Sequence, residues 1–406
     1  MKNNEIDIAI IGGGASGLCA AIEAKRNNKK LKVAVFEKLA RVGKKILATG
    51  NGRCNLSNIN ATENSYNNPD FCKNIFGKFS VEKTLKFFNS IGLYTTVDPE
   101  GRVYPVSNTA SSVLDCLRLE AEKTGVIFYC ENKIETVEKN KNHFIINKNF
   151  YAKKIIFATG GKASPAQGSD GSGYDLLKSF GIKIIKPVPA LVPIKTGTKY
   201  TKQLKGIRCS AKLTLVSDNK ILAENRGEIL FADYGISGIA SMELGGIVAR
   251  NSDKKMLLNI DLLPSFSYEK IYEIISKTNF ENTENLLIGL LPKKLGQVVC
   301  KSAGISTLNQ STDKLSQNDY KKIAAKIKCF TLEVKGTRDF DFAQITAGGA
   351  DTKQFNEKTE AKNIKGLFCV GELLDIDGGC GGFNLQWAFA SGLCAGYYAS
   401  EDLKNA

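Results

Sequence analysis

A glycine-rich turn at residues 12–17 constrains this chain more than any other feature of its sequence. The motif Gly12-x-Gly14-x-x-Gly17 follows an apolar, strand-like segment at 6–11 and opens helical sequence at 15–25. A second strand-like segment, 32–37, ends in Glu37, twenty residues after the last glycine. In a βαβ unit of this kind the first glycine permits a tight turn, the second lets the backbone approach a pyrophosphate, and the third lets helix and sheet pack closely. Glu37 is then placed to accept hydrogen bonds from an adenosine ribose, so the turn predicts a dinucleotide-binding domain.

Further glycine turns decide between FAD and NAD, which share this fingerprint. Gly160 follows a strand-like segment at 154–158, and Gly371 and Glu372 follow another at 366–370. A glycine-rich run at 378–386 then leads into a last helix that starts at about residue 384. Because open α/β sheets bind ligands at the carboxyl ends of their strands, these turns favour an extended FAD with the last helix N-terminus near its ring. The sequence has no second strand–G-x-G-x-x-G–helix unit, so NAD(P)H is expected only as a transient electron donor.

The middle of the chain differs from its two ends in the pattern of its residues. Prolines at 187, 189 and 193 mark a boundary, after which alternation at 212–216 and 227–231 predicts antiparallel strands. Helical periodicity follows at 268–277 and 319–328, with Ser316 and Asp319 as a capping box. We therefore predict an α/β protein whose Rossmann-like FAD-binding domain is formed by both chain ends, 1–189 and 341–406. The insert comprises a β-rich, barrel-like segment at 190–262 and 328–340 and a helical subdomain at 263–327, and the stretch 43–58 is expected to be a loop.

Positive charge is the compositional exception. The chain carries 56 Lys and Arg against 41 Asp and Glu, a net +15, and residues 186–340 hold 24 basic against 15 acidic side chains, a net +9. A polyanion such as ribosomal RNA is therefore a candidate partner of the basic insert. The alternative is that a lysine-rich proteome raises basic surfaces in general, in which case the excess is incidental.

Cysteine usage and apolar stretches bear on the compartment. The eleven cysteines include no C-x-x-C pair, which argues against a disulfide framework, a redox pair and a zinc site, so we expect no metal and a reducing cytoplasm. Glycines and polar residues interrupt the apolar stretches at 8–22 and 378–400, so no membrane segment is expected. Gly392-x-x-x-Gly396 is expected to allow close helix packing inside a soluble domain. The sequence leaves the oligomeric state open.

Four motifs are specific enough to indicate a family. They read IIGGGASG at 10–17, VGKKILATGNGRCNLSN at 42–58, ATGG at 158–161 and GLFCVGELLDIDGGCGGFNLQWAFASG at 366–392. With these motifs nearly the whole chain resembles the BaiN/RdsA family of FAD-dependent oxidoreductases, within the glutathione-reductase-like flavoprotein superfamily. The resemblance implies FAD contacts at the pyrophosphate (Gly12, Gly14, Ala15, Ser16, Gly17), at the adenosine (Glu37, Lys38), nearer the ring (Lys45, Gly50, Gly52, Arg53, Cys54, Asn55) and on its other side (Gly371, Glu372, Asn384, Leu385).

The resemblance also suggests an activity. The leading expectation is flavin-dependent reduction of a conjugated C=C, with a uridine of 23S ribosomal RNA converted to dihydrouridine. One alternative is a small-molecule flavoenzyme that oxidises an amine or reduces an enone. Another is a non-catalytic scaffold in which the flavin only orders the fold.

One segment departs from the family pattern, and the single histidine of the chain bears on how protons could be transferred. Family members usually read Phe-Thr-His-x-Gly-x-Ser-Gly-Pro in the insert, whereas residues 231–239 read FADYGISGI, so Thr, His and Pro are all replaced. If that histidine takes part in chemistry or substrate binding in the family, this protein must do without it or use Asp233 or Tyr234 instead. His143 is the only histidine and lies in a polar turn, which argues against imidazole catalysis. Cys54 and Cys380 are the catalytic candidates, because Arg53 beside the first and helix N–H dipoles beside the second would lower the thiol pKa.

Overall fold

Two compact units make up the protein. A computed structural model describes residues 4–403, and its contacts separate Met1–Val188 with Ile345–Ala406 from Pro189–Gln344. The boundaries therefore fall at 188/189 and 344/345, against the predicted 189/190 and 340/341. Both chain ends form the first unit, and the insert is the second, which confirms the predicted fold class.

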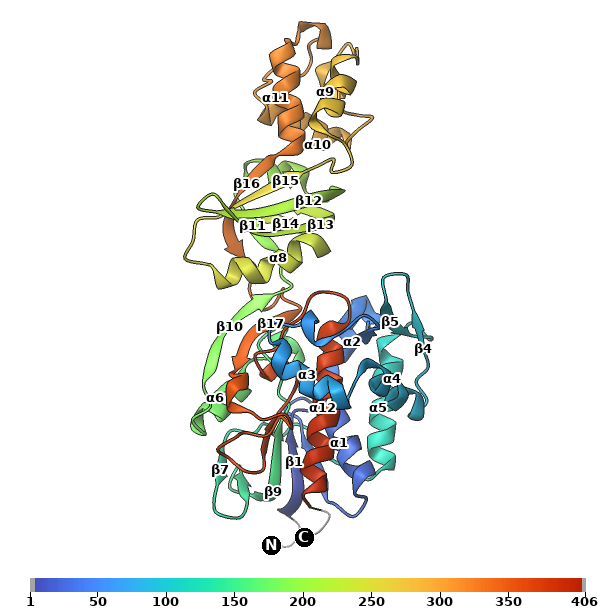
Figure 1. The fold of residues 1–406 in the computed structure, drawn as a ribbon, viewed down its shortest axis with the longest axis vertical. Coiled ribbons are helices and arrows are strands. Elements are labelled where there is room, and N and C mark those ends of the chain that lie inside the picture. The colour runs from blue at the N-terminus through green and yellow to red at the C-terminus, as the bar shows by residue number, and fades with distance from the viewer. Residues whose placement is uncertain (1–3, 404–406) are drawn as a thin grey trace. The chain divides into compact units, whose positions relative to one another are not determined.

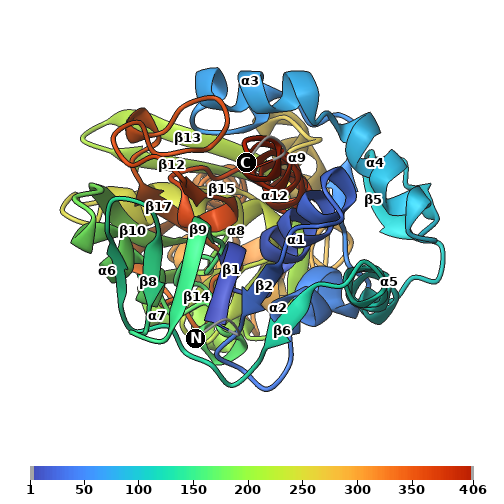
Figure 2. The same ribbon diagram turned by 90° about the horizontal axis from the view of Figure 1, so that it is seen from below.

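A largely parallel sheet forms the centre of the first unit. Its strand order is β6-β2-β1-β9-β8-β7, and β18 also pairs with β9. Figure 2 shows β6, β2, β1 and β9 side by side. β1 and β2 are almost continuously apolar because the core covers both faces of the sheet. The strands are β1 (Glu5–Ile11), β2 (Val33–Phe36), β6 (Ile127–Tyr129), β7 (Val137–Lys139), β8 (Phe144–Ile146), β9 (Phe150–Phe157) and β18 (Leu367–Cys369).

The first and last helices of the unit pack against each other. α1 (Ala15–Asn27) and α12 (Phe383–Glu401) run side by side in Figure 1. A Cβ on Gly392 would collide with the Ser16 carbonyl oxygen, and one on Gly396 with that of Ala20. The Gly392-x-x-x-Gly396 motif therefore permits this close approach, as predicted. Within residues 4–403 no helix combines the length and apolar character that a membrane crossing requires.

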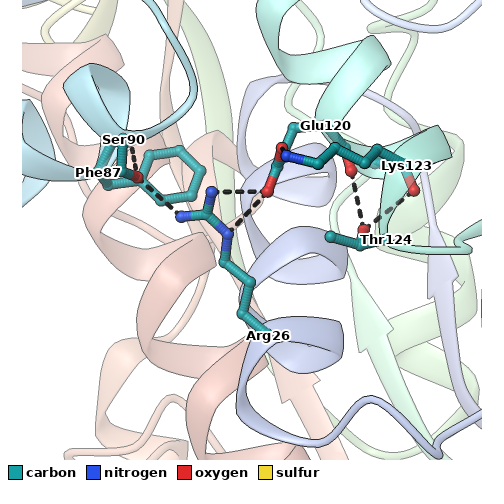
Figure 3. Close-up of polar contacts among 7 residues, drawn as sticks. Arg26, Phe87, Ser90, Glu120, Lys123 and Thr124 are labelled. Carbon is teal, nitrogen blue, oxygen red and sulfur yellow. Dashed lines mark hydrogen bonds and ion pairs between the residues drawn. The ribbon is translucent and has the colours of Figure 1, made fainter.

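Arg26 connects three helices of this unit (Figure 3). From the last turn of α1 its guanidinium donates to Glu120 Oε1 on α5 (Ala110–Lys123) through Nε at 3.0 Å and Nη2 at 2.6 Å. Nη1 donates to Ser90 Oγ on α4 (Val81–Ser90) at 2.9 Å, and the guanidinium carbon lies 5.3 Å from the centre of the Phe87 ring. Arg26 therefore links α1, α4 and α5 through one side chain.

The stretch 43–58 is more structured than predicted. It contains α2 (Lys44–Ala48), a 3-10 turn (Thr49–Gly52) and β3 (Ser57–Asn58), so the expectation of a plain loop is wrong. Ile46, Cys54 and Leu56 are buried and anchor it, a pattern that the surrounding glycines and asparagines obscure. β3 pairs with β5 (Arg102–Pro105), which pairs with β4 (Thr95–Val97). The unit also contains α3 (Pro69–Lys78), α6 (Ser172–Ser179) and the pair β10 (Ile184–Ala190) with β17 (Ile345–Ala350).

A closed antiparallel barrel forms the second unit together with its helices. The barrel order is β11-β14-β13-β12-β15-β16. Its members are β11 (Ile194–Thr196), β12 (Arg208–Ser217), β13 (Lys220–Ala232), β14 (Gly235–Ser237), β15 (Leu257–Asp261) and β16 (Phe330–Thr337). The helices are α7 (Thr198–Thr201), α8 (Ile239–Arg250), α9 (Tyr268–Ser276), α10 (Lys293–Ser302) and α11 (Gln317–Lys328). Barrel and helices share one hydrophobic core, and the Ser316–Asp319 capping box is confirmed at the start of α11.

Candidate cofactor site

The glycine turn after β1 has the shape of a pyrophosphate cradle. Gly12 has φ +107°, and a Cβ there would collide with the Ala158 carbonyl oxygen, while a Cβ on Gly17 would collide with the Gly12 carbonyl oxygen. A Cβ on Gly14 would meet no atom within 4 Å. The first and third glycines are therefore required by packing, and the second leaves space for a ligand. α1 begins at Ala15 with no side-chain cap, so N–H groups of its first turn are available to an anion.

Glu37 and Lys38 lie at the end of β2 next to this cradle. Glu37 Oε2 accepts from the Gly13 N–H at 3.0 Å and Oε1 from the Leu39 N–H at 2.9 Å, which fixes the carboxylate predicted to bind ribose. Lys38 Nζ lies 2.6 Å from Asp170 Oδ2. Partial burial acts to raise the pKa of Asp170, but hydrogen bonds from Lys38 and Ser172 outweigh it and lower that pKa to about 2. Lys38 is therefore held by an ionised partner that the sequence did not suggest.

The ends of β9 and β18 meet at a polar network. Lys45 Nζ lies 2.8 Å from Glu372 Oε2, and Glu372 Oε1 accepts from the Thr346 N–H at 2.9 Å. Thr346 Oγ1 in turn accepts from the N–H groups of Lys162, at 2.7 Å, and Ala163, at 2.9 Å. The predicted residues Lys45 and Glu372 thus lie together beside the loop that contains Gly160, which has φ +72°. The sequence analysis missed Thr346. The only feature of the sequence that could have indicated it is its position just before the glycine pair Gly348 and Gly349.

Gly371 brings the two chain ends into contact. Its φ is +66°, and a Cβ there would lie 2.8 Å from Ser16 Oγ at the start of α1. Its N–H donates to Ser391 Oγ at 3.0 Å, and its carbonyl oxygen accepts from Trp387 Nε1 at 3.1 Å. Both partners are on α12, so this helix holds the second glycine turn against the first.

Three asparagines shape the glycine-rich turn before α12. Asn384 Oδ1 accepts from the Gly378 N–H at 2.9 Å, and its Nδ2 donates to the carbonyls of Gly378 and Gly379. Asn58 Nδ2 donates to the Gly381 carbonyl at 3.0 Å. Asn55, with its amide oriented to suit both neighbours, donates to the Ser57 carbonyl and accepts from the Gly382 N–H.

These contacts bear on the predicted ring-side residues. The side chains of Asn55 and Asn384 position the turn, and Asn58 is a further positioning residue that sequence reasoning missed. Gly382 is the N-cap of α12 and provides no side-chain cap, so N–H groups of the first turn remain available beside the half-buried Leu385.

The segment 50–54 has an unusual backbone. Gly50, Asn51, Gly52 and Cys54 all have positive φ, between +55° and +84°. The guanidinium of Arg53 stacks on the Tyr104 ring, 4.9 Å from its centre. For non-glycine residues this conformation is uncommon and tends to occur at ligand sites. The predicted ring-side residues therefore lie on a segment with a defined shape.

Cys54 does not have the lowered pKa that was predicted. Its side chain is fully buried, and burial raises its pKa to about 11, with only a partial opposing effect from a hydrogen bond to Thr49. The prediction failed because the thiol lies in the core, whereas Arg53 stacks on Tyr104. Any catalytic role of Cys54 would use the neutral thiol. Cys380 is half-buried in the glycine turn before α12, and its catalytic role stays a prediction.

The other candidates lie outside the glycine turns. His143 is in the turn between β7 and β8, where it hydrogen-bonds with Asn140 and packs against Tyr151. Asp233 forms an ion pair with Lys205 at 2.9 Å, and the Tyr234 ring faces Arg338. Across residues 4–403 no cluster of His, Cys, Asp and Glu is suited to hold a metal, and no disulfide joins the cysteines.

A Rossmann-type domain with an inserted barrel, whose two ends meet around a pyrophosphate cradle, defines an FAD-binding flavoenzyme. Comparison with known proteins identifies the family. The chain matches the HI0933-like protein Rossmann domain over residues 6–398 and belongs to that family of FAD-dependent oxidoreductases. The protein is therefore an enzyme, and the alternative of a non-catalytic scaffold that is only ordered by flavin is wrong.

Named relatives indicate the range of this family. A 3-dehydro-bile acid delta(4,6)-reductase of Clostridium scindens is 36% identical, with 97% of this chain and 99% of the relative covered. A ribosomal RNA dihydrouridine synthase of Haemophilus influenzae is 28% identical, with 94% and 95% covered. Among solved structures, the 3-ketosteroid delta1-dehydrogenase of Sterolibacterium denitrificans has a TM-score of 0.50 at 14% identity, with 98% of this chain and 100% of that chain covered, which shows likeness of fold alone.

Proposed function

We propose that this FAD-dependent oxidoreductase takes electrons from NAD(P)H and reduces a C=C bond conjugated to a carbonyl, with a uridine of 23S ribosomal RNA as its substrate. The product would be dihydrouridine. The observation that carries the choice of RNA is the excess of positive charge, a net +9 over residues 186–340. The full-length similarity to a ribosomal RNA dihydrouridine synthase supports it. We place the reaction in the cytoplasm, where ribosomal RNA and NAD(P)H are both present.

Part of this charge is available to a polyanion. Lys294 and Lys301 are exposed and lie seven residues apart, so they project from the same side of α10. Within residues 4–403 neither forms an ion pair. Lysines without a carboxylate partner can neutralise phosphates and release counterions, which makes affinity for RNA sensitive to salt.

The site's own residues would orient the cofactor and supply a proton. Bound FAD would supply hydride transfer to C6 of the uracil ring. Gly14 and the first turn of α1 would hold the pyrophosphate, and Glu37 the ribose. The first turn of α12, kept in shape by Asn384, would direct N–H groups toward negative charge on the ring. Cys380 is the candidate donor of the proton that C5 requires.

A second candidate is reduction of a small enone. The relative that is 36% identical over almost the whole chain is named a bile acid reductase, and its name describes the same bond type. In that case the basic surface would be incidental. No contact in the structure favours the amine oxidase among the earlier alternatives.

One anaerobic experiment separates these substrates. The yellow holoenzyme is reduced with NADPH, and either ribosomal RNA lacking dihydrouridine or a steroid enone is added while flavin absorbance is followed. Reoxidation by RNA at low salt, with a two-hydrogen mass gain at one uridine, is the expected result. Reoxidation only by the enone would favour the second candidate. Mass mapping of 23S RNA from a strain lacking the gene should show one uridine that has lost its two-hydrogen adduct.

A further inference from the structure

The barrel unit carries an arginine whose guanidinium lies over two aromatic rings. The guanidinium carbon of Arg338 lies 4.7 Å from the centre of the Tyr234 ring and 3.4 Å from that of Phe342. The two ring contacts restrict the guanidinium, whose N–H donors lie within its own plane and remain able to bind an acceptor. Within residues 4–403 no carboxylate forms an ion pair with Arg338, although Asp339 is adjacent in sequence. An oriented guanidinium without a counter-charge is suited to bind an oxyanion.

A second positive charge lies on the same side of the barrel wall. β11 pairs with β16 in the register Ile194 with Thr337 and Lys195 with Gly336, and the Arg338 N–H extends this ladder to the Pro193 carbonyl at 2.9 Å. Ile194 is buried in the barrel core. Because side chains alternate along a strand, Lys195 and Arg338 lie on the outer side of the barrel wall, opposite to Ile194. They form a diagonal pair whose Cα atoms are about 7–8 Å apart. Lys195 is exposed and, within the described part of the chain, has no ion-pair partner.

Within the described part of the chain no carboxylate forms an ion pair with either member, although Asp339 and Asp341 are close to Arg338 in sequence. Asp233 is the acid beside Tyr234, and it is already paired with Lys205 at 2.9 Å. Tyr234 itself belongs to the segment 231–239 that departs from the usual family pattern. Tyr234 occupies a position that this pattern leaves open, and the adjacent Asp233 stands where the pattern has histidine. Phe342 is 48% exposed, so this second ring in contact with the guanidinium also meets solvent.

We propose that Arg338 and Lys195 form an oxyanion subsite for the substrate and that Phe342 offers its ring to a base next to that anion. For the identity of the anion this inference rests on the proposed function: a phosphate of the RNA strand. Proteins bind single-stranded RNA through phosphate contacts from basic residues combined with stacking of bases on aromatic rings. A carboxylate on a small substrate would present the same chemistry to the same two residues.

The test uses full-length holoenzyme and an RNA fragment containing the target uridine. Binding is measured over a range of salt concentrations for wild type, R338M, R338K and K195M. R338M is expected to weaken binding about tenfold and to reduce the slope of log affinity against log salt by about 1. R338K keeps the charge and the slope but loses several-fold in affinity, because an ammonium group cannot reproduce the stacked planar fork. The control R208M removes an exposed arginine that is already paired with Glu228, and it should change affinity less than twofold.

Further readouts keep the proposal falsifiable. FAD content and the rate of flavin reduction by NADPH should match wild type in every variant. If R338M does not retain FAD, the test uses K195M and F342L instead, because both positions are exposed. RNA affinity and salt slope equal to those of wild type in both of these variants would overturn the proposal. Wild-type RNA affinity and salt slope in an R338M protein that is folded and retains FAD would also overturn the proposal.

If wild type itself binds no RNA, the proposed RNA function fails. The subsite is then tested with an enone acid and its methyl ester. R338M should raise KM about tenfold for the acid and leave KM for the ester unchanged. A wild-type KM for the acid in R338M, or the same rise in KM for acid and ester, would overturn the subsite.

Discussion

At the scale of single residues, the candidate cofactor site depends on side chains that join backbone segments. Thr346 is the clearest case, because its buried hydroxyl accepts from two N–H groups of the loop after β9. T346V preserves shape but removes the acceptor. We expect it to lower the free energy of unfolding by about 2 kcal/mol and to weaken FAD binding, because the loop beside Glu372 loses its anchor. T346S retains the hydroxyl and is the control; equal FAD dissociation constants for T346V and T346S would contradict this role.

Cys54 provides a prediction about pH. Its pKa is raised from 9.0 to about 11 by burial, so the folded state favours the neutral thiol. The resulting stabilisation is complete below pH 9 and is lost as the pH rises toward 11. We expect the stability difference between wild type and C54A, measured by urea unfolding under reducing conditions, to shrink by about 2 kcal/mol between pH 8 and pH 11. A difference that stays constant over this range would contradict the raised pKa.

Residues with a local signal could be predicted, and residues that act across the fold could not. Gly12, Gly14 and Gly17 form a motif whose spacing fixes their roles, and the structure gives each the expected surroundings. Asn58 and Thr346 make contacts more than 180 residues away in sequence, and nothing near them indicates this. The pKa of Cys54 was misjudged for a related reason: a sequence neighbour, Arg53, need not be a spatial partner of the thiol.

At the scale of elements, the contact between α1 and α12 determines how the two chain ends meet. G392A adds a Cβ against the Ser16 carbonyl oxygen, so the helices must separate. We expect unfolding to become easier by about 2–3 kcal/mol and FAD to be lost, because Ser16 adjoins Gly371. The matched control is G77A in α3, where a Cβ meets nothing within 4 Å and should stabilise by about 0.5–1 kcal/mol. Similar unfolding curves for the two variants would refute the close-packing role of Gly392.

Arg26 allows a second test at this scale. The side chain of Glu120 is only 10% exposed, so R26M leaves a largely buried carboxylate whose remaining cation is Lys123 Nζ at 3.5 Å. We expect R26M to lower the free energy of unfolding by about 1–3 kcal/mol. Adding E120Q should recover part of this loss in a double-mutant cycle. Additive effects of the two substitutions would mean that the pair does not couple α1 to α5.

Elements were predictable where their own residues carry the pattern. Alternation identified β12 and β13, and the capping box identified the start of α11. The short strands β11 and β14 close the barrel through pairings with partners far along the chain, and three residues are too few for a periodic signal. The turns of 43–58 were missed because their buried residues are separated by glycines and asparagines that are typical of loops.

At the scale of the whole molecule, the two units have separate hydrophobic cores, while the residues predicted to bind FAD all lie in the first. These residues come from segments more than 350 positions apart, such as Gly14 and Gly371, so the site exists only when both chain ends are folded together. A ligand that binds only the folded state stabilises by about 4 kcal/mol at a thousandfold excess over its dissociation constant. FAD should therefore stabilise the first unit and leave the second unchanged.

This asymmetry can be measured by calorimetry of the apoprotein. Saturating FAD should raise the Tm of one transition by on the order of 10 °C and leave a second transition, from the barrel unit, in place. G14V is the sharpest control. Gly14 has φ −83° and its Cβ position is open, so valine should cost the apoprotein only about 1 kcal/mol, as a poorer N-cap of α1, while it fills the space kept for the pyrophosphate. FAD should then produce no shift. A G14V protein that FAD still stabilises would place the dinucleotide somewhere other than the turn between β1 and α1.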